Sequence, residues 1–446
     1  MVRDASRLGW DLKRLQRDNK LKIVFTSPHV FGIELRSPDS LLLEAAAEIG
    51  AQRIFIDGIG LLRPSPSAGL VPNGSGWYRE LLQQLLQSLE RENLTAILSH
   101  EAGLLPETQA TLEMAGFLAD TVIELGHDRR SRLGQRSLEV VKNRGGGFVS
   151  GKHSMHITSG KGLQVFRRVQ APVVRNLDQP TSRAKRSVIG VQALDDLVGG
   201  GLYDGSTTMV VGVSGAGKTV LGTQLLLEGA IKDKQRGLLV SLDEHPAQII
   251  RNAETIGVDL RGLIDSGMIH IFYESPQELE IDVHFARLTK AIEEHDIQRL
   301  VIDGVTSYST ALDDQRSYRD FFHALVAFSK YRLMTTFFNY ENPELFGLSA
   351  YMPEFPVSSI VDNIILLSLV ELGNTLHRTI AVVKARGCKH EFETREIIIG
   401  PGGITMLPID PEALLDARPI ESYSSVLSRA PTRLSGRHLA ARSANA

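Results

Sequence analysis

The chain has 446 residues, of which 42% are hydrophobic and 23% charged, and its net charge is −3. This is the composition of a globular protein of two or three domains, and its slight acidity argues against a nucleic-acid or membrane partner, which would need a basic face. The single Cys388 excludes a disulfide framework and a cysteine zinc site, residues 1–22 lack the apolar core of a signal peptide, and the apolar run 360–372 is too short to span a bilayer, so we expect a cytoplasmic protein.

The first elements of the chain recur in its second half. Gly9-Trp10-Asp11-Leu12 matches Gly257-Val258-Asp259-Leu260, and VVKNRG at 140–145 matches VVKARG at 382–387. The copies lie about 245 residues apart, far beyond the spacing of 20–50 residues that is typical of solenoid repeats. The pattern therefore predicts two whole domains of one fold.

The first copy lacks a counterpart of residues 188–249. We expect an incomplete first domain at 1–169, a linker at 170–187, a complete domain at 188–408 and a mobile tail at 409–446. The missing part includes an interior strand, so the first domain should expose apolar edges. Two explanations stay open: the coding sequence starts upstream of Met1, or the chain keeps a degenerate half-domain.

Residues 212–219 read GVSGAGKT, the complete phosphate-binding pattern G-x-x-x-x-G-K-[ST], which occurs once. A β-branched run at 207–211 predicts a strand before it, and apolar residues from Val220 onward predict a helix after it. Such a loop at a helix N-terminus binds anions through its backbone N–H groups. A chance glycine turn is the alternative. The expected nucleotide-binding residues are Gly212, Ser214, Gly215, Ala216, Gly217, Lys218, Thr219 and Val220, with Lys218 catalytic and Thr219 also on Mg²⁺.

Carboxylates follow two further predicted strands. The strand at 238–242 ends at Asp243 and Glu244, and the strand at 299–302 ends at Asp303. Because the carboxyl ends of parallel strands face one crevice, all three should lie near the phosphate loop. We expect Asp303 to hold Mg²⁺, and Asp243 and Glu244 to position or deprotonate the nucleophile. The alternatives are a capping aspartate and a solvated acidic turn.

Two later strand ends carry polar residues. Asn339 ends a predicted strand at 335–339, either as a sensor of the γ-phosphate or as a simple turn residue. Lys384 and Arg386 alternate at the end of a strand at 379–383, so both cations can point at one target. Phosphoryl transfer needs such positive charge on the γ-phosphate, whereas the alternative is a solvated strand end.

Over residues 7–407 the chain resembles the KaiC family of RecA-like ATPases. The likeness runs from GVQALDDL at 190–197 and GGGL at 199–202 through the phosphate loop, the acidic pair and Asp303 to the Lys-x-Arg-Gly strand end. It implies an α/β fold of tandem RecA-like P-loop NTPase domains with mostly parallel, doubly wound sheets, the first domain being incomplete. It also implies a homo-oligomer, a hexamer in the family, in which Lys384 and Arg386 act in trans on nucleotide bound by the neighbour.

The resemblance also implies autophosphorylation. Ser358 and Ser359 stand where the family has an adjacent Ser-Thr acceptor pair, whereas the first copy has Gly116 and Phe117. Two small residues packing at a strand start are the alternative. The sequence departs from the family pattern at Asp243, which replaces a longer Glu, at Pro353, which replaces a regulatory Thr, and in its tail.

These features predict an ATP- and Mg²⁺-dependent ATPase with Ser/Thr autokinase activity and a signalling or clock-related role, in which the tail binds signalling partners. Two alternatives stay open. One is a DNA-dependent ATPase of the RecA or RadA type, against which the acidic balance and the single cysteine argue. The other is a non-catalytic scaffold whose assembly is gated by nucleotide.

Overall fold

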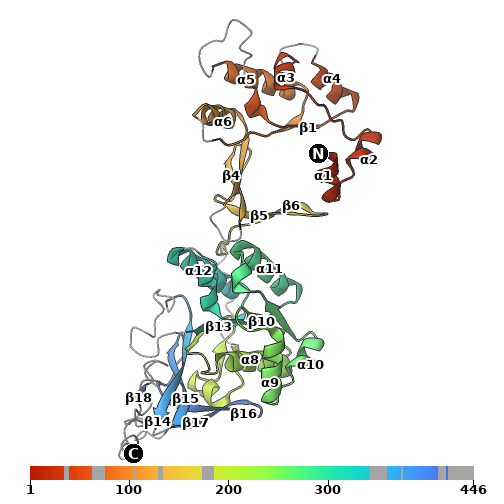
Figure 1. Cartoon of the computed structure of the whole chain (residues 1–446). Coiled ribbons are helices and arrows are strands. Elements are labelled where there is room, and N and C mark those ends of the chain that lie inside the picture. The colour runs from red at the N-terminus through yellow and green to blue at the C-terminus, as the bar shows by residue number, and fades with distance from the viewer. Residues whose placement is uncertain are drawn as a thin grey trace, which may run out of the picture. The chain divides into compact units, whose positions relative to one another are not determined.

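Figure 1 shows the computed structural model, which describes residues 1–34, 40–62, 76–103, 106–128, 134–172, 185–312, 314–341, 359–372, 375–409 and 418–419. The chain divides into two compact units, Met1–Arg168 and Val169–Ala446, called unit 1 and unit 2 below. Pro353, Ser358, most of the predicted linker and nearly all of the predicted tail lie outside the described residues.

Unit 2 is built on one mixed sheet, ten-stranded over the described residues. Neighbouring strands along β11, β10, β12, β13, β9 and β14 are parallel to one another. Neighbouring strands along β14, β15, β16 and β17 are antiparallel. This arrangement confirms the predicted α/β class with a mostly parallel core. In spatial order the strands are β11 (Ile269–Tyr273), β10 (Gly237–Ser241), β12 (Arg299–Asp303), β13 (Thr335–Glu341), β9 (Thr207–Gly212), β14 (Asn363–Leu372), β15 (Thr375–Ala385), β16 (Thr394–Gly400) and β17 (Gly403–Pro408), with β18 (Arg418–Pro419) on β14; β7 (Arg186–Ser187) and β8 (Leu202–Tyr203) pair separately.

Helices cover both faces of this sheet (Figure 1). Successive residues of a strand point to opposite faces, so each strand contributes side chains to two cores. Val210, Val301 and Phe337 pack in one core with α8, α9 and α10. Met209, Ile302 and Phe338 pack in the other core with α11 and α12. The helices and turns are α7 (Gln192–Leu197), α8 (Lys218–Glu228), the π-helical η2 (Gly229–Asp233), α9 (Pro246–Thr255), α10 (Leu260–Asp265), η3 (Pro276–Glu278), α11 (Ile281–Glu294), η4 (Val305–Thr310) and α12 (Gln315–Tyr331).

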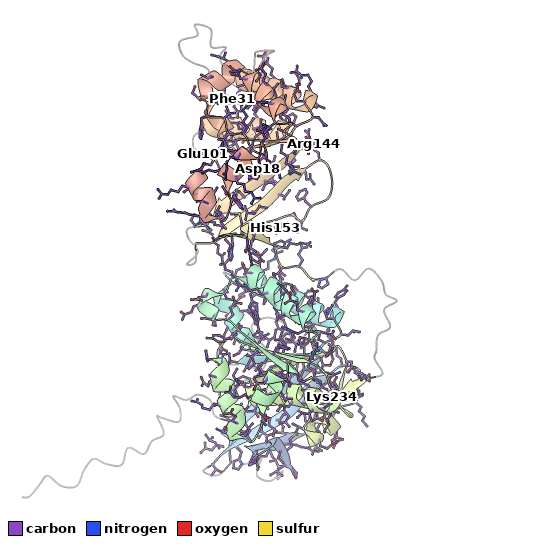
Figure 2. All side chains as sticks on the ribbon, turned by 90° about the vertical axis from the view of Figure 1, so that its right-hand side faces the viewer. Asp18, Phe31, Glu101, Arg144, His153 and Lys234 are labelled. Carbon is purple, nitrogen blue, oxygen red and sulfur yellow. The ribbon has the colours of Figure 1, made fainter. Side chains whose placement is uncertain are left out.

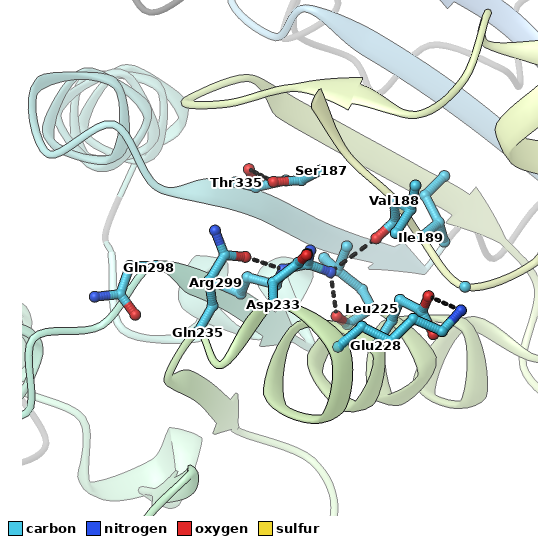
Figure 3. Close-up of polar contacts among 12 residues, drawn as sticks. Ser187, Val188, Ile189, Leu225, Glu228, Asp233, Gln235, Gln298, Arg299 and Thr335 are labelled. Atoms are coloured by element: carbon cyan, nitrogen blue, oxygen red, sulfur yellow. Dashed lines mark hydrogen bonds and ion pairs between the residues drawn. The ribbon is translucent and has the colours of Figure 1, made fainter. Parts of the chain in front are cut away.

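Arg299, at the first position of β12, is fully buried and ties this strand to the far end of α8 (Figure 3). Its guanidinium donates to the carbonyls of Val188 and Leu225 at 2.8 and 2.7 Å, to Gln235 Oε1 at 2.7 Å and to Asp233 Oδ2 at 2.6 Å. Burial lowers the pKa of Arg299, and the negative charge of Asp233 opposes this. Because α8 begins at the phosphate loop and β12 ends at Asp303, the network fixes the two elements that carry the site.

Unit 1 contains the counterparts of β12 to β17 but splits its sheet in two. β1 and β2 form a parallel pair, and β3 to β6 form an antiparallel sheet. In unit 2 the strand β9 pairs with both β13 and β14 and joins the two halves, whereas the described part of unit 1 has no strand in that place. The elements are α1 (Val2–Arg7), α2 (Leu12–Arg17), α3 (Pro28–Glu34), α4 (Leu41–Glu48), β1 (Arg53–Ile56), η1 (Ile59–Leu61), α5 (Gly76–Arg91), β2 (Thr95–Leu98), α6 (Pro106–Leu118), β3 (Thr121–His127), β4 (Arg136–Asn143), β5 (His153–Thr158) and β6 (Gly162–Phe166).

Among the described residues, apolar side chains cover one face of the β1–β2 pair. The core of unit 1 gathers Phe31 (labelled in Figure 2) with apolar residues of α5 and η1. On the other face Phe55 is 63% and Ile97 66% exposed, whereas their counterparts Val301 and Phe337 are fully buried. The sequence predicted exposed apolar edges in the first domain, and the structure shows exposed apolar side chains on this face of the strand pair. No helix within the described ranges is long and apolar enough to cross a membrane.

Candidate functional site

The phosphate-binding loop connects β9 to α8, as its strand-loop-helix pattern predicts. Gly215 and Gly217 adopt left-handed backbone conformations, with φ of +78° and +106°, which other residues rarely adopt. A Cβ at Gly217 would also press on Ile399 Cδ1, at 3.0 Å. The loop thus brings backbone N–H groups to the start of α8, where the helix dipole favours an anion. Of the residues predicted to bind nucleotide, Gly212 ends β9, those from Ser214 to Gly217 lie in the loop, and those from Lys218 to Val220 form the first turn of α8.

Lys218 lies inside the loop and is 9% exposed. Its Nζ donates to the carbonyls of Gly212 and Val213, each at 2.9 Å. Burial lowers the pKa of Lys218, while the carboxylates of Glu341, Asp303 and Asp243 act in the opposite direction. These carboxylates therefore favour the charged ammonium that the phosphate chemistry requires.

Asp303 and Thr219 meet beside Lys218. The Thr219 hydroxyl donates to Asp303 Oδ2 at 2.7 Å, and Asn339 Nδ2 donates to Asp303 Oδ1 at 2.9 Å. Burial raises the pKa of Asp303, and these two hydrogen bonds oppose the shift. Asn339 is fully buried inside β13, which continues to Glu341, so the reading of Asn339 as a turn residue is wrong.

These residues fit a magnesium nucleotide. A hydroxyl and a carboxylate oxygen are hard ligands of the kind Mg²⁺ prefers, and this ion is usually held by one or two carboxylates together with substrate phosphates. Within the described residues no group of three or more His, Cys, Asp or Glu side chains could hold a metal alone. The donor set therefore suits a cation that arrives with ATP.

Asp243 and Glu244 follow β10 after one intervening residue, Leu242, and the last residue of β10 pairs with Asp303. Burial raises the pKa of Glu244, and the negative charges of Asp303 and Asp243 raise it further. Its Oε2 atom is buried and has no hydrogen-bond partner in the described parts of the chain. A carboxylate with a raised pKa at the mouth of a phosphate site has the properties of a general base.

Lys384 and Arg386 lie at the opposite end of the sheet from the phosphate loop. Lys384 pairs with Ile364 and donates to the carbonyl of Val361 at 2.7 Å, and Arg386 donates to the carbonyl of Ser359 at 2.8 Å. Val361 is six residues before Leu367, the partner of Gly212, or roughly 20 Å along an extended chain. Within one chain the structure therefore does not bring Lys384, Arg386 or Ser359 to the phosphate loop.

Unit 1 repeats this arrangement of cations. Lys142 donates to the carbonyls of Gly116 and Phe117, at 2.9 and 2.8 Å, and Arg144 (labelled in Figure 2) donates to the Phe117 carbonyl at 3.1 Å. The Lys-x-Arg pattern thus makes the same local contact in both units. Its cations donate to backbone carbonyls just before the paired strand, which is β14 in unit 2 and β3 in unit 1.

Sequence reasoning missed two charged residues of the site. Arg378 Nε donates to the carbonyl of Gly215 at 3.0 Å, so β15 contacts the phosphate loop. Among the carboxylates that raise the pKa of Lys218, Glu341 has the largest effect. Glu341 follows Asn339 by two positions and could have been found by extending the strand, whereas Arg378 depends on strand register that no local pattern reveals.

Comparison with known proteins identifies the family. The family model described as "ATPase: KaiC" matches residues 1–170 and 188–410. The chain is 28% identical over 442 residues to the circadian clock oscillator protein KaiC of Acaryochloris marina, which covers 98% of this chain and 80% of that protein. It is similarly 28% identical to KaiC of Parathermosynechococcus lividus, covering 97% of this chain and 77% of the relative, and 27% identical to KaiC 1 of Synechocystis, covering 98% and 80%. The predicted resemblance is thereby confirmed, and the chain belongs to the KaiC family of RecA-like ATPases.

Proposed function

We propose that unit 2 binds Mg-ATP and transfers its γ-phosphoryl group to water and to a serine hydroxyl. Bound Mg-ATP supplies the transferable phosphoryl group together with the cation that neutralises its charge. The loop from Gly212 to Val220 cradles the phosphates, Lys218 neutralises the transferred group, and Thr219 with Asp303 holds the cation. Asp243 and Glu244 orient the attacking hydroxyl and accept its proton. The single observation that carries the proposal is the cluster of Lys218, Thr219 and Asp303 at a complete phosphate loop.

The proposal extends to a homo-oligomer that acts in trans, with six chains as the proposed state. Phosphoryl transfer requires positive charge at the γ-phosphate, yet Lys384 and Arg386 are at the wrong end of the sheet to supply it within their own chain. A head-to-tail contact between copies would bring this end of one chain to the phosphate loop of the next. Ser359, whose carbonyl is held by Arg386, would enter the neighbouring site with it. This supports Ser359 and its neighbour Ser358 as the acceptors.

A mixing experiment tests action in trans. One variant, Lys218→Ala, lacks the phosphate contact, and a second, Lys384→Ala with Arg386→Ala, lacks the cations. Each is expected to be inactive alone, whereas an equal mixture should regain activity at about a quarter of its interfaces, where an intact loop meets intact cations. Failure of every mixture to regain activity, with assembly verified by size, would contradict the trans arrangement.

Phosphorylation is tested separately by incubation with Mg-ATP and mass spectrometry. Phosphate is expected on the peptide containing Ser358 and Ser359 in the wild type and should be lost in Lys218→Ala. Replacement of both serines by Ala should remove the phosphate while ATP hydrolysis continues. Phosphate persisting in Lys218→Ala would refute autokinase activity.

Because the named relatives are circadian clock oscillator proteins, we place this chain in timing or signalling in the cytoplasm. We also propose the tail at 409–446 as its contact with partner proteins.

A further inference from the structure

The short helix η4 contacts the acidic turn of the site. It starts directly after Asp303 and Gly304, and its Ser307 hydroxyl donates to Asp243 Oδ1 at 2.5 Å. Gly304 adopts a left-handed conformation with φ of +86°, and a Cβ there would collide with Asp243 Oδ2. The Asp243 carboxylate is therefore seated over Gly304 and tied to Ser307.

The inner side of η4 is fixed by a buried chain of polar groups. Tyr308 and His284 are both fully buried, and the Tyr308 hydroxyl lies 2.8 Å from His284 Nε2. His284 Nδ1 lies 2.7 Å from Glu274 Oε2. A carboxylate only accepts, so Nδ1 donates to Glu274, and in the neutral ring Nε2 then accepts from the tyrosine hydroxyl. With Tyr308 held in this way, the adjacent Ser307 presents its hydroxyl from a rigid support.

The two carboxylates of the acidic turn differ in their partners. The backbone of Glu244 is held by Ser241, whose hydroxyl donates to the Glu244 carbonyl at 2.6 Å and accepts from the Glu244 N–H at 3.2 Å. The Glu244 Oε2 atom is partnerless within the described residues, whereas the Asp243 carboxylate accepts from Ser307.

We propose that Ser307 is a positioning residue that fixes the Asp243 carboxylate for phosphoryl transfer in unit 2. The hydroxyl occupies one carboxylate oxygen and holds the side chain over Gly304, which sets where the other oxygen points. Small misplacements of a catalytic group reduce rates strongly. The inference rests on the proposed function, because Asp243 matters only where phosphate is transferred.

The test compares steady-state Mg-ATP hydrolysis by the full chain and its variants. Ser307→Ala should lower kcat by about tenfold or more and leave KM for ATP within about twofold, since Ser307 positions a reacting group and does not bind nucleotide. Ser309→Ala is the matched control, because Ser309 lies in the same helix and donates to the Thr306 carbonyl. This control should behave as the wild type.

Two further comparisons separate positioning from a merely structural role. Ser307→Thr keeps the hydroxyl and should retain most of kcat. Ser307→Val has the shape of the Thr variant without its hydroxyl and should lose as much kcat as Ser307→Ala. In an Asp243→Asn background, Ser307→Ala should cause little further loss, because Ser307 acts through the Asp243 carboxylate and that carboxylate is no longer present.

The inference is overturned if Ser307→Ala and Ser307→Val both turn over at the wild-type rate, or if their losses multiply with that of Asp243→Asn. Absence of hydrolysis in the wild type would overturn the proposed function itself, and the positioning role with it. The two failures are thus distinguishable.

Discussion

Replacement of Arg299 by Met should destabilise unit 2 strongly. The change keeps the apolar stem but removes the donors to the carbonyls of Val188 and Leu225, to Gln235 and to Asp233. The carbonyl of Val188 loses its donor at a cost of about 1–3 kcal/mol, whereas that of Leu225 keeps the Gly229 N–H at the end of α8, and Asp233 loses its buried partner. Asp233 is 34% exposed, so water recovers part of its loss. We therefore expect a total loss of about 3–5 kcal/mol, a large part of the about 5–15 kcal/mol that stabilises a domain.

Hydrogen exchange followed by mass spectrometry measures this loss locally, which matters because a chain of two units need not unfold in one step. Peptides from α8 and β12 should lose protection by the stated amount. Arg236→Met is the matched control, because Arg236 is exposed and donates to a single carbonyl, that of His295, at 3.2 Å. Equal protection in the two variants, each within about 1 kcal/mol of the wild type, would refute the reasoning, since an exposed contact of this kind is worth little.

Three other predictions concern the acidic residues and the repeat. Burial and two neighbouring carboxylates raise the pKa of Glu244, so the rate of hydrolysis should rise with pH through a midpoint above 4.5, the pKa of an ordinary Glu. Glu244→Gln should abolish this rise at acidic pH. An unchanged pH profile in the variant would contradict the role of Glu244 as the general base. The raised pKa of Asp303 means that its ionised form destabilises the fold above the ordinary value of 3.8. Asp303→Asn should therefore melt at an equal or higher temperature without nucleotide while hydrolysis falls about 100-fold, an effect of the size seen when charge stabilisation is lost; a lower melting temperature would count against this account. Phe337→Ala should cost about 3–5 kcal/mol because Phe337 is fully buried, whereas the counterpart Ile97→Ala should cost under about 1 kcal/mol because Ile97 is 66% exposed. Equal losses on chemical denaturation would contradict the comparison of the two units.

Local patterns predicted the fold and much of the site. The strand expected at 299–302 is β12, which ends at Asp303, and the run expected at 207–211 is β9, which leads into the phosphate loop. These elements follow from apolar runs bounded by glycines and carboxylates, and their convergence follows from the parallel sheet. The meeting of Thr219 with Asp303 could therefore be anticipated without coordinates.

Contacts that depend on register could not be predicted. The approach of Arg378 to Gly215 and of Ser307 to Asp243 joins segments far apart in the sequence. Lys384 and Arg386 do point toward the same segment, 359–361, as their alternation along the strand suggests. Within the chain, however, they bind backbone carbonyl oxygens of that segment and not a phosphate. No pattern within one strand distinguishes a carbonyl of the same chain from a phosphate of another.

The missing counterpart of β9 has the clearest structural consequence. Without a strand between β2 and β3 in the described part of unit 1, the parallel pair and the antiparallel sheet do not join. Phe55 and Ile97 then lack the cover that α8 gives to their counterparts in unit 2. This outcome was predictable because an interior parallel strand is buried on both faces.

Counting bound nucleotide tests the central claim most directly, which is that unit 2 alone carries the ATP site. Equilibrium titration of the full chain with Mg-ATP, or with a slowly hydrolysed analogue, gives the number of sites per chain. The account predicts one site, which is lost in Lys218→Ala. Two sites per chain, or one site that survives Lys218→Ala, would contradict it.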